Sequence, residues 1–397
     1  MLIAENQLKN FQAGFKIIRY FGDAVHDFDP ITDEFLVRDS NAILRAKRRY
    51  PFATGVVLVI LIQVIIATYL DLITQADFLQ CIFLLGAYFA MAYAQWSTIT
   101  KRHKMEQIFN HMLQFEKANN SSNWKPDGLT GAFVVQLVRL LTFPFPSGIL
   151  AYLGQVLLLP CLPAHFGFFL LPQCSSKINS LEIFKMFPSS KLVYEVFMRI
   201  LTVLCGGFAA CVLFPAFILD LNISYMWCHC IRNYIKLYSR ILSNISVNTK
   251  NFHGKVSTFR QIQLITVEFN SYHQKYNAVT KISIMVIGID IALYALIRLY
   301  DSLLAPQILT YVTAVFEFFC GILFAYGLKA CVYVASKQLL EDTKGLQGLH
   351  GHKWFRRYFR SWPVLKVYMG SVNFIDQVTP LTVLDFAISQ LVSLLLL

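Results

Sequence analysis

Seven stretches of the chain are apolar over about the twenty residues that a helix needs to cross a bilayer. They cover residues 53–72, 76–95, 132–159, 193–219, 282–300, 307–335 and 379–397. The prolines at positions 144, 146 and 215 fall inside these stretches and are expected to break the helices there. The pattern predicts an all-α membrane protein with seven transmembrane helices.

Polar segments separate these stretches, and their basic residues predict an orientation. Lys and Arg number 8 in residues 1–52, 5 in 96–126, 8 in 226–281 and 7 in 336–376, out of 35 in the chain. Because cytoplasmic loops are enriched in Lys and Arg, the N-terminus is predicted to be cytoplasmic and the C-terminus extracellular. This leaves 1–52 as a cytoplasmic N-terminal segment and 53–335 as a six-helix bundle. Apolar residues at helical spacing in 226–281 predict extensions of the flanking membrane helices.

Composition agrees with this class of protein. The hydrophobic fraction is 56% and the mean hydropathy is +0.51, above the roughly 45–50% apolar share of soluble domains. The net charge of +12 is assigned to cytoplasmic loops beside a lipid bilayer, so no nucleic-acid partner is predicted.

The last stretch, 379–397, carries a stripe of polar residues. Thr382, Asp385, Ser389 and Ser393 follow one another at steps of three, four and four, which places them on one helical face with Gln390 beside it. Such a face is costly against lipid. It either bonds to neighbouring helices or lines a water-filled path that the four leucines at positions 394–397 would narrow.

No motif for catalysis is present. The sequence has no Gly-rich phosphate loop, no His-Glu-x-x-His and no nucleophile elbow, so no catalytic residue, cofactor or enzyme activity is predicted. The short runs at residues 228–230 and 350–352 lack the paired spacing of a zinc site, and no metal is expected. Cys161 and Cys174 share a predicted outer loop and are expected to form a disulfide.

The layout resembles the arthropod chemoreceptor superfamily, which contains the gustatory and odorant receptors. The shared features are seven spans, a cytoplasmic N-terminus, long inner loops, short outer links and a chain that ends with the seventh span. The final nine residues, Ser389 to Leu397, match the usual family ending in length and apolar middle, but both of its signature pairs are replaced. The region from Trp96 to Arg102 and the stretch from Phe259 to Ile262 also look similar. A gustatory receptor is favoured, with an odorant receptor as the close alternative.

The resemblance implies a ligand-gated cation channel in the plasma membrane of sensory neurons. Four subunits, as a homotetramer or with related receptors, would each contribute the seventh helix to one pore. Ser389, Gln390, Ser393 and Leu397 would line it, with Leu397 at the narrowest point. Asp385 would concentrate cations at the inner mouth or form a salt bridge to the third cytoplasmic loop. Residues 336–378 would form a cytoplasmic anchor, whose basic and aromatic part packs between subunits or lies on lipid headgroups.

The resemblance places the ligand, a small-molecule tastant or odorant, in the outer half of helices two to six. Candidate residues there are Tyr88, Tyr152, Gln155, Asp290, Tyr294, Tyr311, Phe316 and Glu317. Two acidic groups with several tyrosines suit a polyol, a sugar or an amine. Alternatively Asp290 pairs with Arg298, since paired charges are common inside membranes. A transporter or a metabotropic seven-helix receptor is the other functional class, although the chain shows no pair of mirrored halves.

Overall fold

The computed structural model describes residues 25–118 apart from positions 30, 31 and 33, then 191–243, 252–274, 277–344, 357, 361–371 and 373–396. The fold is mainly helical, as predicted. Its helices are α2 (Ser40–Tyr69), α3 (Gln75–Thr100), α4 (Arg102–Ala118), α7 (Lys191–Ser243), α8 (Phe252–His273), α9 (Asn277–Arg298), α10 (Ala305–Gly321), α11 (Gly327–Lys344) and α13 (Thr379–Leu396). Short elements are the 3₁₀ turn η4 (Tyr300–Ser302), the π-helical turn η5 (Ile322–Tyr326) and the strands β1 (His26–Asp29), β2 (Glu34–Val37), β3 (Tyr368–Met369) and β4 (Asn373–Phe374).

Five helices in the described ranges are long and apolar enough to cross a membrane. They are α2, α3, most of α9, the continuous run from α10 through η5 into α11, and α13. All five coincide with predicted spans, so the fold class of a multi-pass helical membrane protein is confirmed. The predicted span 132–159 lies outside the described residues. The count of seven and the orientation therefore stay predictions.

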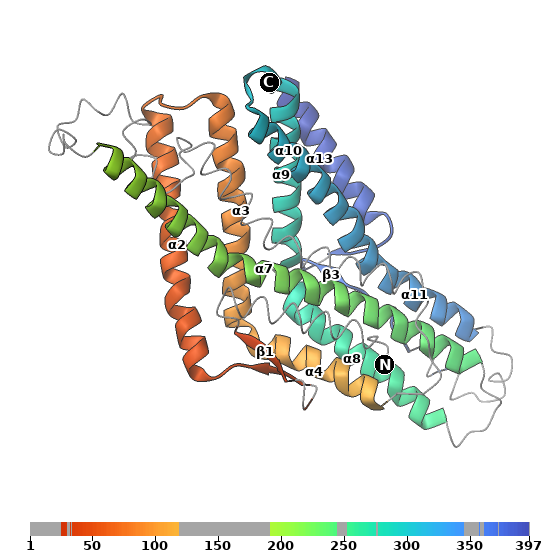
Figure 1. Ribbon diagram of the computed structural model, residues 1–397. Helices are drawn as coiled ribbons and strands as arrows, with labels where there is room; N and C mark the ends of the chain where they lie inside the picture. Colours follow the sequence, from red (N-terminus) through yellow and green to blue (C-terminus); the bar gives the residue numbers. More distant parts are fainter. Residues whose placement is uncertain are drawn as a thin grey trace.

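The helices divide into a long bundle and a compact end (Figure 1). In the bundle α2 packs on α3, α3 on α9, and α9 on both α10 and α13. At the other end α4, α8, α11 and the second half of α7 lie together. The antiparallel hairpin of β1 and β2 is attached to α4, where the Asn110 side chain bonds to both the backbone nitrogen and the carbonyl of Phe35 at 2.8 Å.

The helix α7 joins the two parts. It runs without interruption for 53 residues, so the expected break at Pro215 is wrong. Polar groups of neighbouring turns can compensate for the missing backbone N–H of a proline in such a helix. The predicted extension of the fourth span into the segment 226–281 is present in α7. Residues 252–273 of that segment form a separate helix, α8, which ends at His273 before α9 begins at Asn277.

The main hydrophobic core lies at the compact end. Trp227 of α7 is fully buried and stacks on Phe269 of α8, with ring centroids 3.6 Å apart and an interplanar angle of 7°. Tyr234 of α7 donates a hydrogen bond to the buried Glu116 of α4 at 2.8 Å. Aromatic stacking in a fully buried core stabilises this end beyond the burial of area alone.

The segment that leads into α13 is attached to this core. Trp362 stacks on Phe259 of α8 with centroids 4.0 Å apart. The side chain of Asn270 donates to the carbonyl of Lys366 at 2.8 Å and accepts from the backbone nitrogen of Tyr368 at 3.0 Å. These contacts attach residues 362–369, which belong to the predicted anchor 336–378, to the compact end; the role of an anchor stays a prediction.

The start of α13 depends on Asp376. Its Oδ1 accepts from the backbone nitrogens of Val378 and Thr379 at 3.1 and 2.9 Å and from the Thr379 hydroxyl at 2.7 Å. The bond from the Thr379 hydroxyl is the main reason that the pKa of this carboxyl lies below its ordinary value of 3.8.

We expect Asp376→Ala to destabilise the first turn of α13 by about 0.5–2 kcal/mol, as for lost helix caps, whereas Asp376→Asn keeps an acceptor and should cost less. Melting temperatures of the purified variants test this. Because the folded pKa is depressed, the stabilising effect of the charge is fully present above pH 3.8 and is lost as the pH falls through the folded pKa. Equal melting temperatures of the wild type and Asp376→Ala at neutral pH would contradict the assignment.

Candidate functional site

The polar face of α13 is exposed. The helix packs on α9 and η5 through a narrow stripe that includes Val383, Ala387 and Leu391. The predicted pore residues Asp385, Ser389, Gln390 and Ser393 all lie outside this stripe and are exposed, as is Thr382. Leu397 lies outside the described residues. No described residue thus covers the polar residues of α13.

The side chains on this face suit contact with a cation. The Ser393 hydroxyl donates to the carbonyl of Ser389 at 2.9 Å, and the Thr382 hydroxyl donates to the carbonyl of Val378 at 3.2 Å. Since the hydroxyl hydrogens are used within the helix, the oxygen lone pairs remain available as acceptors. Asp385 makes no ion pair with any residue in the described part of the chain, so its expected alternative partner in the third cytoplasmic loop is not seen there.

The turn that contacts α13 is irregular. The run from α10 to α11 contains the π-helical turn η5, which packs against α13. Two residues of this turn, Ile322 and Tyr326, are fully buried. Single π turns inside α-helices are rare and often occur at functional sites. A change in the backbone geometry of η5 would therefore directly alter its contacts with α13.

The predicted ligand residues divide by exposure. Tyr88 of α3, Asp290 of α9 and Tyr311 of α10 are buried, and Tyr294 is half-buried. Phe316 and Glu317 are exposed, so the structure does not bring them together with Tyr311 in the interior. Tyr152, Gln155 and the proposed disulfide partners Cys161 and Cys174 lie outside the described residues.

Two of the buried candidates have polar atoms without partners. The Tyr311 hydroxyl and Asp290 Oδ1 make no hydrogen bond to any described residue. Tyr311 meets Phe83 of α3 edge-on, with centroids 5.8 Å apart. Asp290 forms no ion pair with Arg298, which is exposed. Buried polar groups are normally paired, so an unpaired set is a candidate for contact with a ligand.

Sequence analysis missed Gln80. This α3 residue is fully buried, and neither its amide nitrogen nor its amide oxygen is bonded within the described ranges. Nearby, the Gln307 amide of α10 donates to Asp77 of α3 at 3.1 Å. An amide inside an apolar span was the signal available in the sequence, since polar residues at membrane depth are functional candidates by default.

A buried charged cluster connects the bundle to the compact end. Asp220 of α7 forms an ion pair with Lys281 of α9 and accepts a hydrogen bond from the Tyr272 hydroxyl of α8 at 2.7 Å. The amine of Lys101, which follows α3, donates to the carbonyl of Tyr272 at 2.9 Å. Lys329 of α11 is buried and interacts electrostatically with Asp220 and Lys281.

His273, the residue next to Tyr272, lies among the same positively charged side chains. Burial, together with the nearby Lys329, Lys281 and Lys101, holds the pKa of His273 well below its usual range. Its ring is therefore neutral at physiological pH. Positive charge outweighs negative charge in this cluster, so Asp220 is the group on which its stability depends.

The described part of the chain offers no candidate metal centre. No group of three His, Cys, Asp or Glu residues comes together within it. Cys228 and Cys230 of α7 are buried in the main hydrophobic core. Residues 350–352 lie outside the described ranges.

Comparison with models of known protein families gives no match, and comparison with curated proteins gives none either. Solved structures do match. The structure of the insect olfactory receptor OR5 from Machilis hrabei aligns with a TM-score of 0.64 at 12% identity, covering 98% of this chain and 97% of that chain. The same receptor in complex with eugenol aligns with a TM-score of 0.64 at 13% identity over the same shares. The chain therefore has the fold of the insect olfactory receptors.

Proposed function

We propose that the protein is a chemosensory receptor that is itself a ligand-gated, non-selective cation channel. The main observation in support is the polar face of α13, which has no packing partner within the described chain. The fold of an insect olfactory receptor supports the same conclusion. In this proposal four copies of the chain meet at α13, with Asp385, Ser389, Gln390, Ser393 and Leu397 facing the pore.

The proposed ligand is a small organic molecule in the outer half of the bundle. The unpaired polar atoms of Gln80, Asp290 and Tyr311 favour a ligand that can form hydrogen bonds. The olfactory receptor OR5, which shares this fold, has been solved in complex with the small molecule eugenol. We favour a taste receptor that forms a homotetramer in the plasma membrane of sensory neurons, and an odorant receptor subunit is the second candidate.

Ligand binding is proposed to act on the pore through α9 and η5. Asp290 lies on α9 and Tyr311 on α10, and the run that contains α10 continues into η5. Both α9 and η5 pack against α13. A rearrangement around the ligand thus has a short path to the pore helix, and a wider ring at Leu397 would admit hydrated cations.

A test of the pore needs no ligand. In cells that express Leu397→Ser, we expect a resting cation current several-fold above the wild type, because a polar ring no longer excludes water. Adding Ser393→Cys to this background should make the current sensitive to a cationic thiol reagent. Leu391→Cys is the matched control, since Leu391 is buried against the rest of the chain.

The outcomes separate clearly. Block of the Ser393→Cys current, with no effect on Leu391→Cys or on the background, supports the pore. Equal sensitivity of both positions, or a current that neither cysteine changes, rules out this face. Epitope tags at the two ends, stained on intact and permeabilised cells, test the orientation separately.

A further inference from the structure

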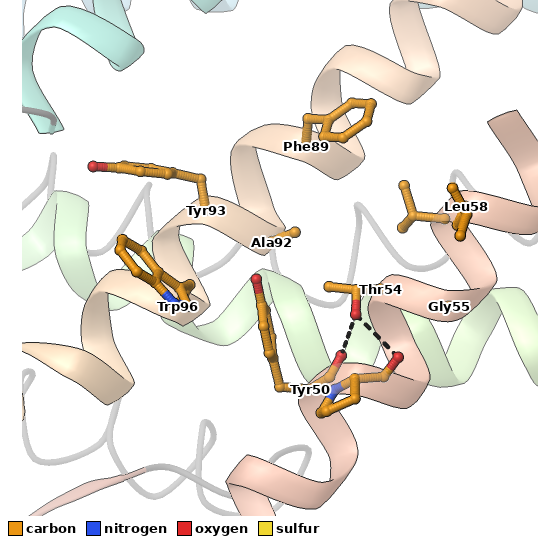
Figure 2. Close-up of a pocket in the computed structure, with 10 residues that line it drawn as sticks. Tyr50, Thr54, Gly55, Leu58, Phe89, Ala92, Tyr93 and Trp96 are labelled. Atoms are coloured by element: carbon orange, nitrogen blue, oxygen red, sulfur yellow. Dashed lines mark hydrogen bonds between the residues drawn. The ribbon is translucent and has the colours of Figure 1, made fainter.

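A second site lies far from the pore helix, in a groove between α2 and α3. Its volume is about 630 Å³, within the roughly 300–1,000 Å³ of small-molecule sites. Figure 2 shows Phe89 and Leu58 reaching toward one end of this α2–α3 groove and Tyr50 and Trp96 standing at the other. The lining is mostly apolar.

Few polar groups face the α2–α3 groove. The Thr54 hydroxyl is occupied by the carbonyls of Tyr50 and Pro51, each at 3.0 Å (Figure 2). The Tyr50 hydroxyl makes no hydrogen bond to a described residue. A mostly apolar trough with the Tyr50 hydroxyl and the Trp96 indole at one end suits an alkyl chain whose head carries hydrogen-bond acceptors.

Basic residues continue the groove at that polar end. Lys47 precedes Tyr50 by three residues and Pro51 by four, and Arg48 precedes Pro51 by three. Both therefore lie on the groove side of α2, one helical turn before the residues that line the groove. Both side chains are exposed, and neither forms an ion pair within the described ranges. Basic residues beside a membrane helix attract anionic lipids of the cytoplasmic leaflet.

The position of the groove favours lipid over a second copy of the chain. In Figure 1, α2 and α13 lie on opposite sides of the bundle, with α3 and α9 between them. If four chains meet at α13, the outer side of α2 faces the bilayer. This step rests on the proposed function.

We infer that the α2–α3 groove binds an anionic phospholipid of the cytoplasmic leaflet. One acyl chain lies along Leu58 and Phe89, and the phosphate lies near the Tyr50 hydroxyl between Lys47 and Arg48. Trp96 and Tyr93 cover the level of the glycerol esters, where aromatic residues commonly sit at membrane interfaces.

Gly55 allows a sharp test. An added Cβ at Gly55, which lines the groove, would meet nothing within 4 Å, and the same is true of Gly86, which is on α3 and does not line it. Gly55→Leu therefore fills the groove, whereas Gly86→Leu is a matched substitution elsewhere. The full-length protein is purified in detergent, incubated with phosphatidylserine and phosphatidylcholine, and analysed by native mass spectrometry.

The wild type and Gly86→Leu should retain phosphatidylserine in preference to phosphatidylcholine. Gly55→Leu should retain about tenfold less phosphatidylserine, because the leucine occupies the space of the acyl chain. Substituting both exposed residues, Lys47→Gln with Arg48→Gln, should lower phosphatidylserine retention about fivefold per charge removed and leave phosphatidylcholine unchanged. This second variant keeps the test valid if Gly55→Leu does not fold.

Three results would overturn the inference. One is equal phosphatidylserine retention by Gly55→Leu and Gly86→Leu, and another is equal binding of both lipids by the wild type. The third is displacement of the phospholipid when cholesterol is added to the same incubation, which would assign the groove to a sterol. Because no current is measured, failure here is distinct from failure of the channel proposal.

Discussion

Asp220→Asn is expected to destabilise the folded protein by about 3–5 kcal/mol, the usual cost of leaving one partner of a buried ion pair alone. The carboxyl side chain is 2% exposed, and it pairs with Lys281, whose side chain is 9% exposed. Asparagine keeps the shape and can still accept from the Tyr272 hydroxyl. The loss therefore reports on charge: Lys281 and Lys329 would remain buried without a counter-ion. Heating followed by size-exclusion chromatography measures the change as a lower melting temperature.

The double variant Asp220→Asn with Lys281→Met identifies the pair as the cause. Removing both charges should recover more than about 1 kcal/mol of the loss, because Lys281 no longer stays buried without its counter-ion and no longer repels Lys329. Lys281→Met alone should also destabilise, by leaving Asp220 with Tyr272 as its main support. If the losses of the two single variants simply add in the double variant, the two residues are not coupled and the assignment of the cluster is wrong.

Trp227→Ala is expected to cost about 3–5 kcal/mol, as for other fully buried large aromatic side chains. Trp227 is completely buried, and its ring lies 3.6 Å from the Phe269 ring. The cavity left in the compact end would separate α7 from α8, which holds residues 366–370 through Asn270 and Gln274. We expect a lower melting temperature and less folded protein after heating.

Trp96→Ala is the matched control for Trp227. Trp96 is 46% exposed, so its truncation should stay within about 0.5 kcal/mol. Comparable losses in the two variants would show that burial at the compact end is not what stabilises the fold. Retention of folded protein by Trp227→Ala at wild-type melting temperature would contradict the prediction outright.

Hydropathy alone located the membrane helices that the structure describes. The predicted stretch 76–95 lies within α3, 282–300 overlaps most of α9, and 379–397 begins at the same residue as α13. These predictions succeed because a spanning helix satisfies its own backbone hydrogen bonds, so its length and apolar content are local properties. The polar face of α13 was readable for the same reason, since four positions on one helix determine it.

Predictions of where helices end were weaker. The helix α2 begins at Ser40, well before the predicted 53, because Asp39 accepts from the backbone nitrogen of Ala42 at 3.2 Å and helix continues through the basic run. The helix α7 passes Pro215 without a break, and η5 replaces one regular turn of the sixth span. The early start of α2 thus follows from a local cap, whereas membrane helices tolerate proline and irregular turns because nearby polar groups can satisfy the freed backbone atoms.

The sequence by itself thus determined the class of multi-pass helical membrane protein, the spans that the structure describes and the polar face of α13, because these depend on neighbours along one helix. Only the tertiary structure paired Asp220 with Lys281 and Tyr272, buried Gln80 and Tyr311 with no hydrogen-bond partner among the described residues, and left Phe316 exposed. It also opened the groove between α2 and α3. These features depend on which helices meet in space, and hydropathy fixes the depth of a residue in the membrane but not the neighbour it faces.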